Sequence, residues 1–121
     1  MNNIDIQPES DLCAPAGARL TEAALAAAAQ VPVARLRAPT RGRKRVALAR
    51  QTAMYLAHVA FGMSLTRVGV CFGRDRTTVR HACALMEDRR DDPRVELGLV
   101  ALERGLLALT ARLESRAKEA R

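Results

Sequence analysis

The sequence is poor in aromatic residues. Only Tyr55, Phe61 and Phe72 are aromatic among its 121 residues, and tryptophan is absent. Because 49% of the residues are nevertheless hydrophobic, alanine, leucine and valine must build the core, and a chain of this length holds one modest core. Alanine-rich and leucine-rich stretches favour closely packed helices. We therefore predict a compact all-α domain.

The sequence also lacks a long apolar run and a basic leader. No stretch reaches the roughly 18 apolar residues typical of a transmembrane helix. The first residues, MNNIDIQPESD, carry acids and no apolar segment, unlike a secretory signal. We expect a cytoplasmic protein without a membrane partner.

Cysteine is scarce and unevenly spaced. Cys13, Cys71 and Cys83 form no C-x-x-C pair, which is typical of reduced thiols in a cytosolic protein. A zinc set of Cys71, Cys83, His58 and His81 can be written down, but its spacings match no usual pattern. We predict no metal site, and we interpret the cysteines as small buried apolar residues.

Positive charge is concentrated in one segment. Residues 35–80 contain eleven basic residues and one acid, Asp75, so the segment carries +10 in a chain whose net charge is +7. Such a field attracts a polyanion, and nucleic acid is the polyanion we expect. A membrane surface would instead need a basic amphipathic helix, whereas the densest basic run, TRGRKR, has the composition of a loop.

Three regions are predicted along the chain: a disordered tail over 1–20, a DNA-binding domain over 21–90, and an amphipathic helix over 91–121. The tail prediction rests on Pro8, Pro15, Gly17 and the lack of any sustained period. Thr21 is expected to cap a helix over 21–30, and a further turn begins at Pro32. Residues 37–45, RAPTRGRKR, form a charged loop.

A helix-turn-helix follows a long helix. Apolar residues recur at helical spacing over 46–61, and Gly62 ends that helix. Ser64 caps a short helix over 64–72, Gly73 makes a turn, and Asp75 caps a second helix over 75–88. Two short helices joined by a glycine-containing turn are typical of DNA-binding proteins. We predict that residues 75–86 enter the major groove.

The last helix begins at Asp92-Pro93, an N-cap followed by a first-turn proline. It carries a stripe with alternating spacings of four and three: Val95, Leu99, Leu102, Leu106, Leu109 and Leu113. Two interpretations fit this stripe. It covers the domain's own core, or it forms the seam of a homodimer.

The run GRDRTTVRHA carries the chemistry, because a recognition helix presents its first turn to the bases. Asp75 can accept a hydrogen bond from cytosine or adenine, Arg76 can form a fork to guanine, and Thr77 can contact a thymine methyl group. Arg80 and His81 lie one turn later, within reach of phosphates or neighbouring bases. The simpler interpretation is that Asp75 is only an N-cap and the arginines form a solvated face.

These residues resemble a known family. ARQTAMYLA, then SLTRVG, then FGRDRTTVRHAC, is similar to the C-terminal helix-turn-helix domain (domain IV) of the bacterial replication initiator DnaA, over about residues 21–90. The resemblance implies that Asp75 and Thr77 read bases. It also places the following residues at the DNA backbone or in the minor groove: Arg41, Arg43, Lys44, Arg45, Arg50, Gln51, His58, Leu65, Thr66, Thr78, Val79 and His81. Arg76 stands where the family has histidine, and Arg80 replaces an apolar residue.

No G-x-x-x-x-G-K-[ST] loop and no catalytic constellation occurs in the sequence. We therefore expect a stand-alone, nucleoid-associated protein that lacks the initiator's ATPase module, is not an enzyme and needs no nucleotide cofactor. It would bind double-stranded DNA selectively at DnaA-box-like sites and regulate transcription or replication initiation. The alternative is a helical protein-interaction module acting on the same machinery.

Overall fold

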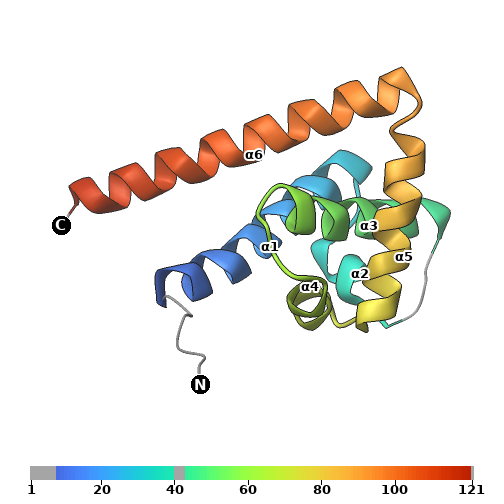
Figure 1. The fold of residues 1–121 in the computed structure, drawn as a ribbon, viewed down its shortest axis with the longest axis horizontal. Coiled ribbons are helices and arrows are strands. Elements are labelled where there is room, and N and C mark those ends of the chain that lie inside the picture. Colours follow the sequence, from blue (N-terminus) through green and yellow to red (C-terminus); the bar gives the residue numbers. More distant parts are fainter. Residues whose placement is uncertain (1–7, 40–42, 121) are drawn as a thin grey trace.

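The computed structural model describes residues 8–39 and 43–120, and these form helices only, as predicted (Figure 1). None of the helices in these ranges is both long and apolar enough to cross a bilayer. The six helices are α1 (Pro8–Ala29), α2 (Val33–Arg37), α3 (Lys44–Val59), α4 (Leu65–Phe72), α5 (Arg76–Arg89) and α6 (Pro93–Glu119).

The centre of the fold is α3, which contacts α1, α2, α4 and α5. Its residues from Thr52 to Ala57 are all buried, and Tyr55 and Leu56 are among the largest fully enclosed side chains. Phe72 of α4 and Leu36 of α2 complete the interior around it. The core is otherwise made of alanine, leucine, valine and methionine, so the helices approach closely, as the composition predicted.

The first helix begins earlier than predicted. Residues 8–20 were expected to be a disordered tail, but α1 starts at Pro8, and Gly17 and Ala18 are buried in the fold. A Cβ on Gly17 would lie 2.9 Å from Cγ of Phe61, so this glycine permits close packing and does not break the helix. Thr21 is not an N-cap, since its buried hydroxyl donates to the Ala18 carbonyl, 2.9 Å away. Residues 1–7 lie outside the described ranges.

A buried carboxylate holds α1 to α2. The Glu22 side chain is 1% exposed, with Oε1 3.2 Å from Nη1 of Arg19 and Oε2 2.8 Å from Nε of Arg37. Arg19 also donates to the Cys71 carbonyl and lies over the Phe72 ring of α4. Glu22 therefore ties α1 to α2, and its partner Arg19 ties α1 to α4. A buried charge of this kind is stable only because it is paired.

The helix-turn-helix is confirmed as α4 and α5. Ser64 caps α4, its Oγ accepting from the Arg67 amide at 3.1 Å, and Gly73 ends that helix with a left-handed φ of 66°. Asp75 caps α5 as predicted. A Cβ on Gly69 would lie 2.4 Å from the Arg74 carbonyl oxygen, so the turn can close only over a glycine.

The residues of the predicted leucine stripe on α6 fall into a buried group and an exposed group. Leu99 and Leu106 are buried, and Val95 and Leu102 are half-buried against the core. In contrast, Leu109 and Leu113 of the same stripe are 45% and 53% exposed. The core-covering interpretation therefore fits the first half of α6, and the second half carries uncovered leucines.

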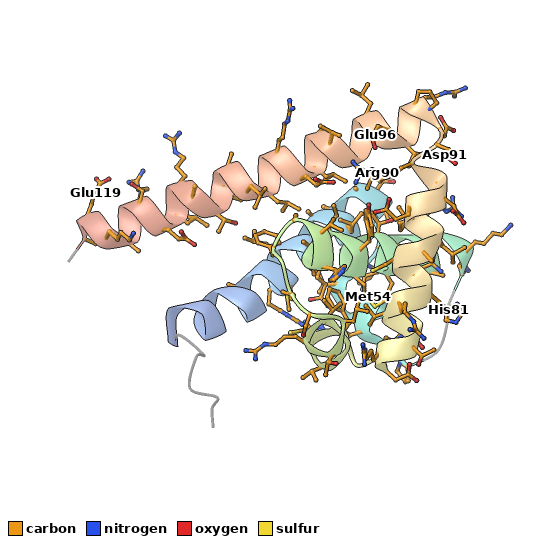
Figure 2. All side chains as sticks on the ribbon, in the orientation of Figure 1. Met54, His81, Arg90, Asp91, Glu96 and Glu119 are labelled. Carbon is orange, nitrogen blue, oxygen red and sulfur yellow. The ribbon has the colours of Figure 1, made fainter. Side chains whose placement is uncertain are left out.

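Arg90 fixes α6 to the body at the junction of α5 and α6 (Figure 2). Its Nη1 donates to the Tyr55 hydroxyl at 3.0 Å and to Oε1 of Glu103 at 2.8 Å, and its Nε donates to Glu96. These bonds raise the pKa of Arg90 and lower the pKa of Glu96, so both stay charged. Burial, followed by the hydrogen bond to Glu87, raises the pKa of Tyr55. No local pattern in the sequence predicted this network.

Candidate nucleic-acid interface

The first turns of α5 present a polar face to solvent. Arg76, Thr77 and Thr78 are exposed, as are Arg80 and His81 one turn later. The amino-terminal end of α5 lies on the side of the body away from α6 (Figure 1), and Figure 2 places His81 on that half of the helix. Helix α6 therefore does not cover the surface that is predicted to read the bases.

Asp75 is the N-cap of α5, as predicted, and its contact with a base stays a prediction. Its Oδ1 accepts from the Thr78 amide at 2.8 Å, which caps the helix. This backbone hydrogen bond lowers the pKa of Asp75, so the carboxylate is ionised at neutral pH. Because Asp75 is exposed to solvent, the same group is accessible as an acceptor for a base amine.

Replacing Asp75 by alanine should lower the melting temperature by about 3–6 °C, because the cap is lost. Asp75→Asn is the matched control, since asparagine also caps and should melt within a degree or two of the parent. Because the folded-state pKa is lowered, the cap's contribution is complete above the ordinary aspartate value. It is lost as the pH falls through the lowered value. Thermal melts from pH 7 to pH 2.5 test this, and equal melting of the parent and Asp75→Ala at neutral pH would contradict it.

A hollow of about 590 Å³ lies between α3 and α5. It brings together four residues that were predicted to contact the DNA backbone: Arg50 and Gln51 of α3, and Thr78 and His81 of α5. Arg74 also lines it. The hollow lies beside the reading face and has a mixed lining, in which apolar side chains such as Met54, Ala82 and Leu85 accompany the polar ones.

Arg50 has an internal role in the structure, and the phosphate contact that the resemblance implies for it stays a prediction. The residue is only 5% exposed, its Nε donates to the Leu36 carbonyl at 2.7 Å, and its Nη2 donates to the Arg35 carbonyl at 3.1 Å. Burial is the main cause that lowers its pKa, with the nearby charge of Arg74 second. The resemblance placed Arg50 on the DNA backbone, whereas in the structure it supports α2.

The structure corrects the predicted position of Val79. It was placed beside the DNA backbone, but its side chain is fully buried at 0% exposure and packs in the core. The residue faces inward because it lies on the same side of α5 as Ala82 and Met86, at helical spacings of three and seven. Any contribution of Val79 to binding is made by holding α5 in place.

The other predicted contacts described by the structure lie on α3 and α4, and their contacts with DNA stay predictions. At the start of α3, Arg43, Lys44 and Arg45 are exposed, while Arg41 lies outside the described residues. At the start of α4, Thr66 is exposed and Leu65 is half-buried. His58, near the other end of α3, donates from Nδ1 to the Met63 carbonyl at 2.7 Å.

One residue at the interface was missed by the sequence prediction. Arg74 directly precedes the cap of α5, and its Nη2 donates to the Ala38 carbonyl at 2.6 Å. Its position within the GRDR run was the available signal, but a surface arginine and an anchoring one look alike in sequence.

The cysteines do not form a metal site within the described residues, where no three histidine, cysteine or acidic side chains gather. Cys71 and Cys83 are half-buried thiols, and burial raises the pKa of Cys83.

Comparison with known proteins identifies the domain. The model of the bacterial DnaA protein helix-turn-helix matches residues 22–85. The chromosomal replication initiator protein DnaA 1 of Protochlamydia amoebophila is 45% identical over 65 residues, which cover 54% of this chain and 14% of that protein. The DnaA of Bifidobacterium animalis subsp. lactis is 51% identical over 53 residues, or 42% of this chain and 9% of that protein.

The DnaA of Laribacter hongkongensis is 44% identical over 63 residues, covering 50% of this chain and 13% of that protein. The chain therefore spans only about a tenth of the length of these relatives. All of α6 lies beyond the residues that the family model matches. With its exposed recognition helix and the match over 22–85, the chain belongs to the bacterial DnaA helix-turn-helix family and carries a DnaA-type domain that binds double-stranded DNA.

Proposed function

We propose that the protein binds duplex DNA selectively at DnaA-box-like sites and regulates transcription or replication initiation by occupying them, without catalysing a reaction. The observation that carries this proposal is the exposed polar first turn of α5. It is capped by Asp75 and held by the core on its other face. The relatives are named as chromosomal replication initiators, which favours sites of the kind that such proteins bind.

Affinity and selectivity come from different residues in this proposal. Arg43, Lys44 and Arg45 are exposed cations at the start of α3, and they would neutralise phosphates. Arg76 and Thr77 on α5 would contact base edges, with Asp75 as a third reader. Arg50 is left out of the phosphate contacts because it is buried and bonded to α2.

Binding should therefore depend strongly on salt. If about five exposed cations displace counterions, the logarithm of the association constant should fall with the logarithm of salt concentration at a slope of about −4.5. Affinity would then drop several hundredfold between about 50 and 200 mM salt. Fluorescence anisotropy with a labelled duplex measures this slope.

The matched control is Arg104→Ala with Arg112→Ala on α6, which should leave the slope unchanged because these exposed arginines lie on a helix outside the family match. A slope shallower than about −2 would contradict the proposed phosphate contacts. Equally tight binding to an RNA hairpin would contradict selectivity for duplex DNA.

A protein-interaction module is the second candidate, and it rests on the exposed Leu109 and Leu113 of α6. In that case Leu109→Ser with Leu113→Ser should abolish the cellular role, while Arg76→Ala leaves it intact. The same leucines would be the seam of the homodimer considered above. Light scattering at high concentration distinguishes a homodimer from a monomer. A homodimer would have twice the mass of the chain, and the double serine variant should then be a monomer.

A further inference from the structure

An open apolar groove lies where the start of α6 meets α3 and the end of α5. Its first part is a hollow of about 210 Å³, bounded by Leu48 of α3, Met86 of α5, and Val95 and Leu102 of α6. A second hollow of about 360 Å³ lies between α3 and the end of α1. Leu48 and Thr52 line both hollows, so the two adjoin and form one groove.

The walls of this groove expose apolar surface. Leu48 is 38% exposed, although it belongs to the central helix α3. Ala28 of α1 is exposed as well, and Val95 and Leu102 are only half-buried. Gly98 leaves the first hollow open, because a Cβ there would meet nothing within 4 Å. Contiguous apolar surface of this kind marks an interaction site when charged groups surround it.

The charges along the groove are all positive. Arg89 and Arg94 line the first hollow and Arg45 lines the second, while no acid among the described residues lines either. The three guanidinium groups are exposed, and within residues 8–39 and 43–120 they make no ion pair. The acids in the same part of α6, Glu96 and Glu103, are already engaged in ion pairs. The groove therefore complements an occupant that is apolar on one side and negatively charged beside it.

The lining also indicates the conformation of the occupant. A proline-rich segment docks in an aromatic-lined groove, and none of the described lining residues is aromatic. An added strand needs a free strand edge, whereas the part of the chain that the structure describes forms helices only. An amphipathic helix needs an apolar groove alone, and it carries its charges along the rim. A helix is therefore the occupant that this surface fits.

A second copy of the chain complements the groove poorly. The exposed leucines Leu109 and Leu113 lie on the second half of α6, and residues 104–119 around them contain four basic and two acidic residues. That half of α6 would bring positive charge to a groove that is already positive. Charge thus favours an acidic partner protein over a second copy.

We propose that this groove is a docking site for an acidic amphipathic helix of a partner protein. Apolar side chains of that helix enter the hollow over Gly98, and its carboxylates pair with Arg89 and Arg94. Apart from Leu48 and Thr52, every residue that lines the first hollow lies beyond the residues that the family model matches. The docking site is separate from the first turns of α5, so it does not depend on the proposed function.

The test uses the full chain and a fluorescent synthetic helix of about 20 residues, with leucines at positions i, i+3, i+4 and i+7 and glutamates beside them. In anisotropy titrations this acidic peptide should bind the parent. Gly98→Met should weaken binding about tenfold, because a side chain at this open position occupies the hollow. Gly105→Met is the matched control on the same helix, since a Cβ there also meets nothing within 4 Å and Gly105 does not line the groove. Its affinity should stay within about twofold of the parent.

Two control peptides separate the apolar contribution from the charge. Replacing the leucines by serine, or the glutamates by lysine, should each weaken binding about tenfold or more. Arg89→Gln with Arg94→Gln should weaken the acidic peptide severalfold and leave the lysine peptide unchanged or tighter. Melting curves of each variant show whether it is folded.

Several results would overturn the docking site. These are no binding of the acidic peptide to the parent, equal binding to the parent and Gly98→Met, and equal binding of the lysine peptide. A doubled mass in light scattering that Gly98→Met abolishes would assign the groove to a second copy instead. Gly98→Met should select the same DNA motif as the parent, so a parent that selects no motif counts against the proposed function and not against the groove.

Discussion

Gly69→Ala should unfold the helix-turn-helix and abolish DNA binding. The added Cβ would lie 2.4 Å from the Arg74 carbonyl oxygen, a distance that real contacts do not reach. The clashing atom belongs to the backbone of Arg74, and the Arg74 amide donates a hydrogen bond to the Gly69 carbonyl. Neither α4 nor the turn can therefore move away without breaking that bond. We expect the free energy of unfolding to fall by about 3 kcal/mol, at the upper end of what overpacking costs. Denaturation in urea measures this loss directly.

Gly98→Ala is the matched control, since Gly98 is also a glycine inside a helix. A Cβ there meets nothing within 4 Å, so the substitution should stabilise the protein by about 0.5–1 kcal/mol through the higher helix propensity of alanine. The two substitutions make the same chemical change with opposite expected signs. If Gly69→Ala were as well tolerated as Gly98→Ala, the close approach between α4 and the turn would be wrong.

The second large effect concerns base reading. Simultaneous replacement of Arg76 and Thr77 by alanine should weaken binding to the preferred site by about a hundredfold or more, since each base contact provides about 1–3 kcal/mol of discrimination. The affinity for unrelated duplex DNA should fall much less, by the contribution of one phosphate contact, because only one cation, Arg76, is lost. The ratio of the two affinities, measured by competition, is the informative quantity.

Stability should not change in that variant, because both side chains are exposed and neither residue belongs to the core; their loss leaves Val79 and Ala82 in place. Arg89→Ala at the other end of α5 is the control for charge, as Arg89 is an exposed arginine far from the first turn. An equal loss of affinity on specific and unrelated DNA would mean that α5 contributes charge alone.

Local signals predicted the helix-turn-helix well. Ser64 and Asp75 cap their helices in the structure as their residue types suggested, and Gly73 adopts the left-handed conformation that ends α4. Caps and turns depend on bonds between residues three or four apart, so a sequence contains nearly all of the information that fixes them.

Tertiary packing decided the features that the sequence did not predict. Gly17 was interpreted as part of a disordered tail, because local sequence does not show that it packs against Phe61, which lies 44 positions away in the chain. Arg50 looked like a surface cation, although the carbonyls of α2 bind it in the interior. The Arg90 network joins three helices through residues as distant as Tyr55 and Glu103. Residue type and spacing do not determine which arginine is internal, because only the assembled fold supplies its acceptors.

Selection of binding sites from a randomised duplex library, carried out in parallel with the parent chain and with Arg76→His, tests the central claim most directly. The variant restores the residue that the resembling family has at this position. We expect the parent to enrich a DnaA-box-like motif, and we expect Arg76→His to change the preference at one base pair and leave the others unaltered. No enriched motif with the parent, or identical motifs with the two chains, would contradict the claim that α5 reads the sequence through its first turn.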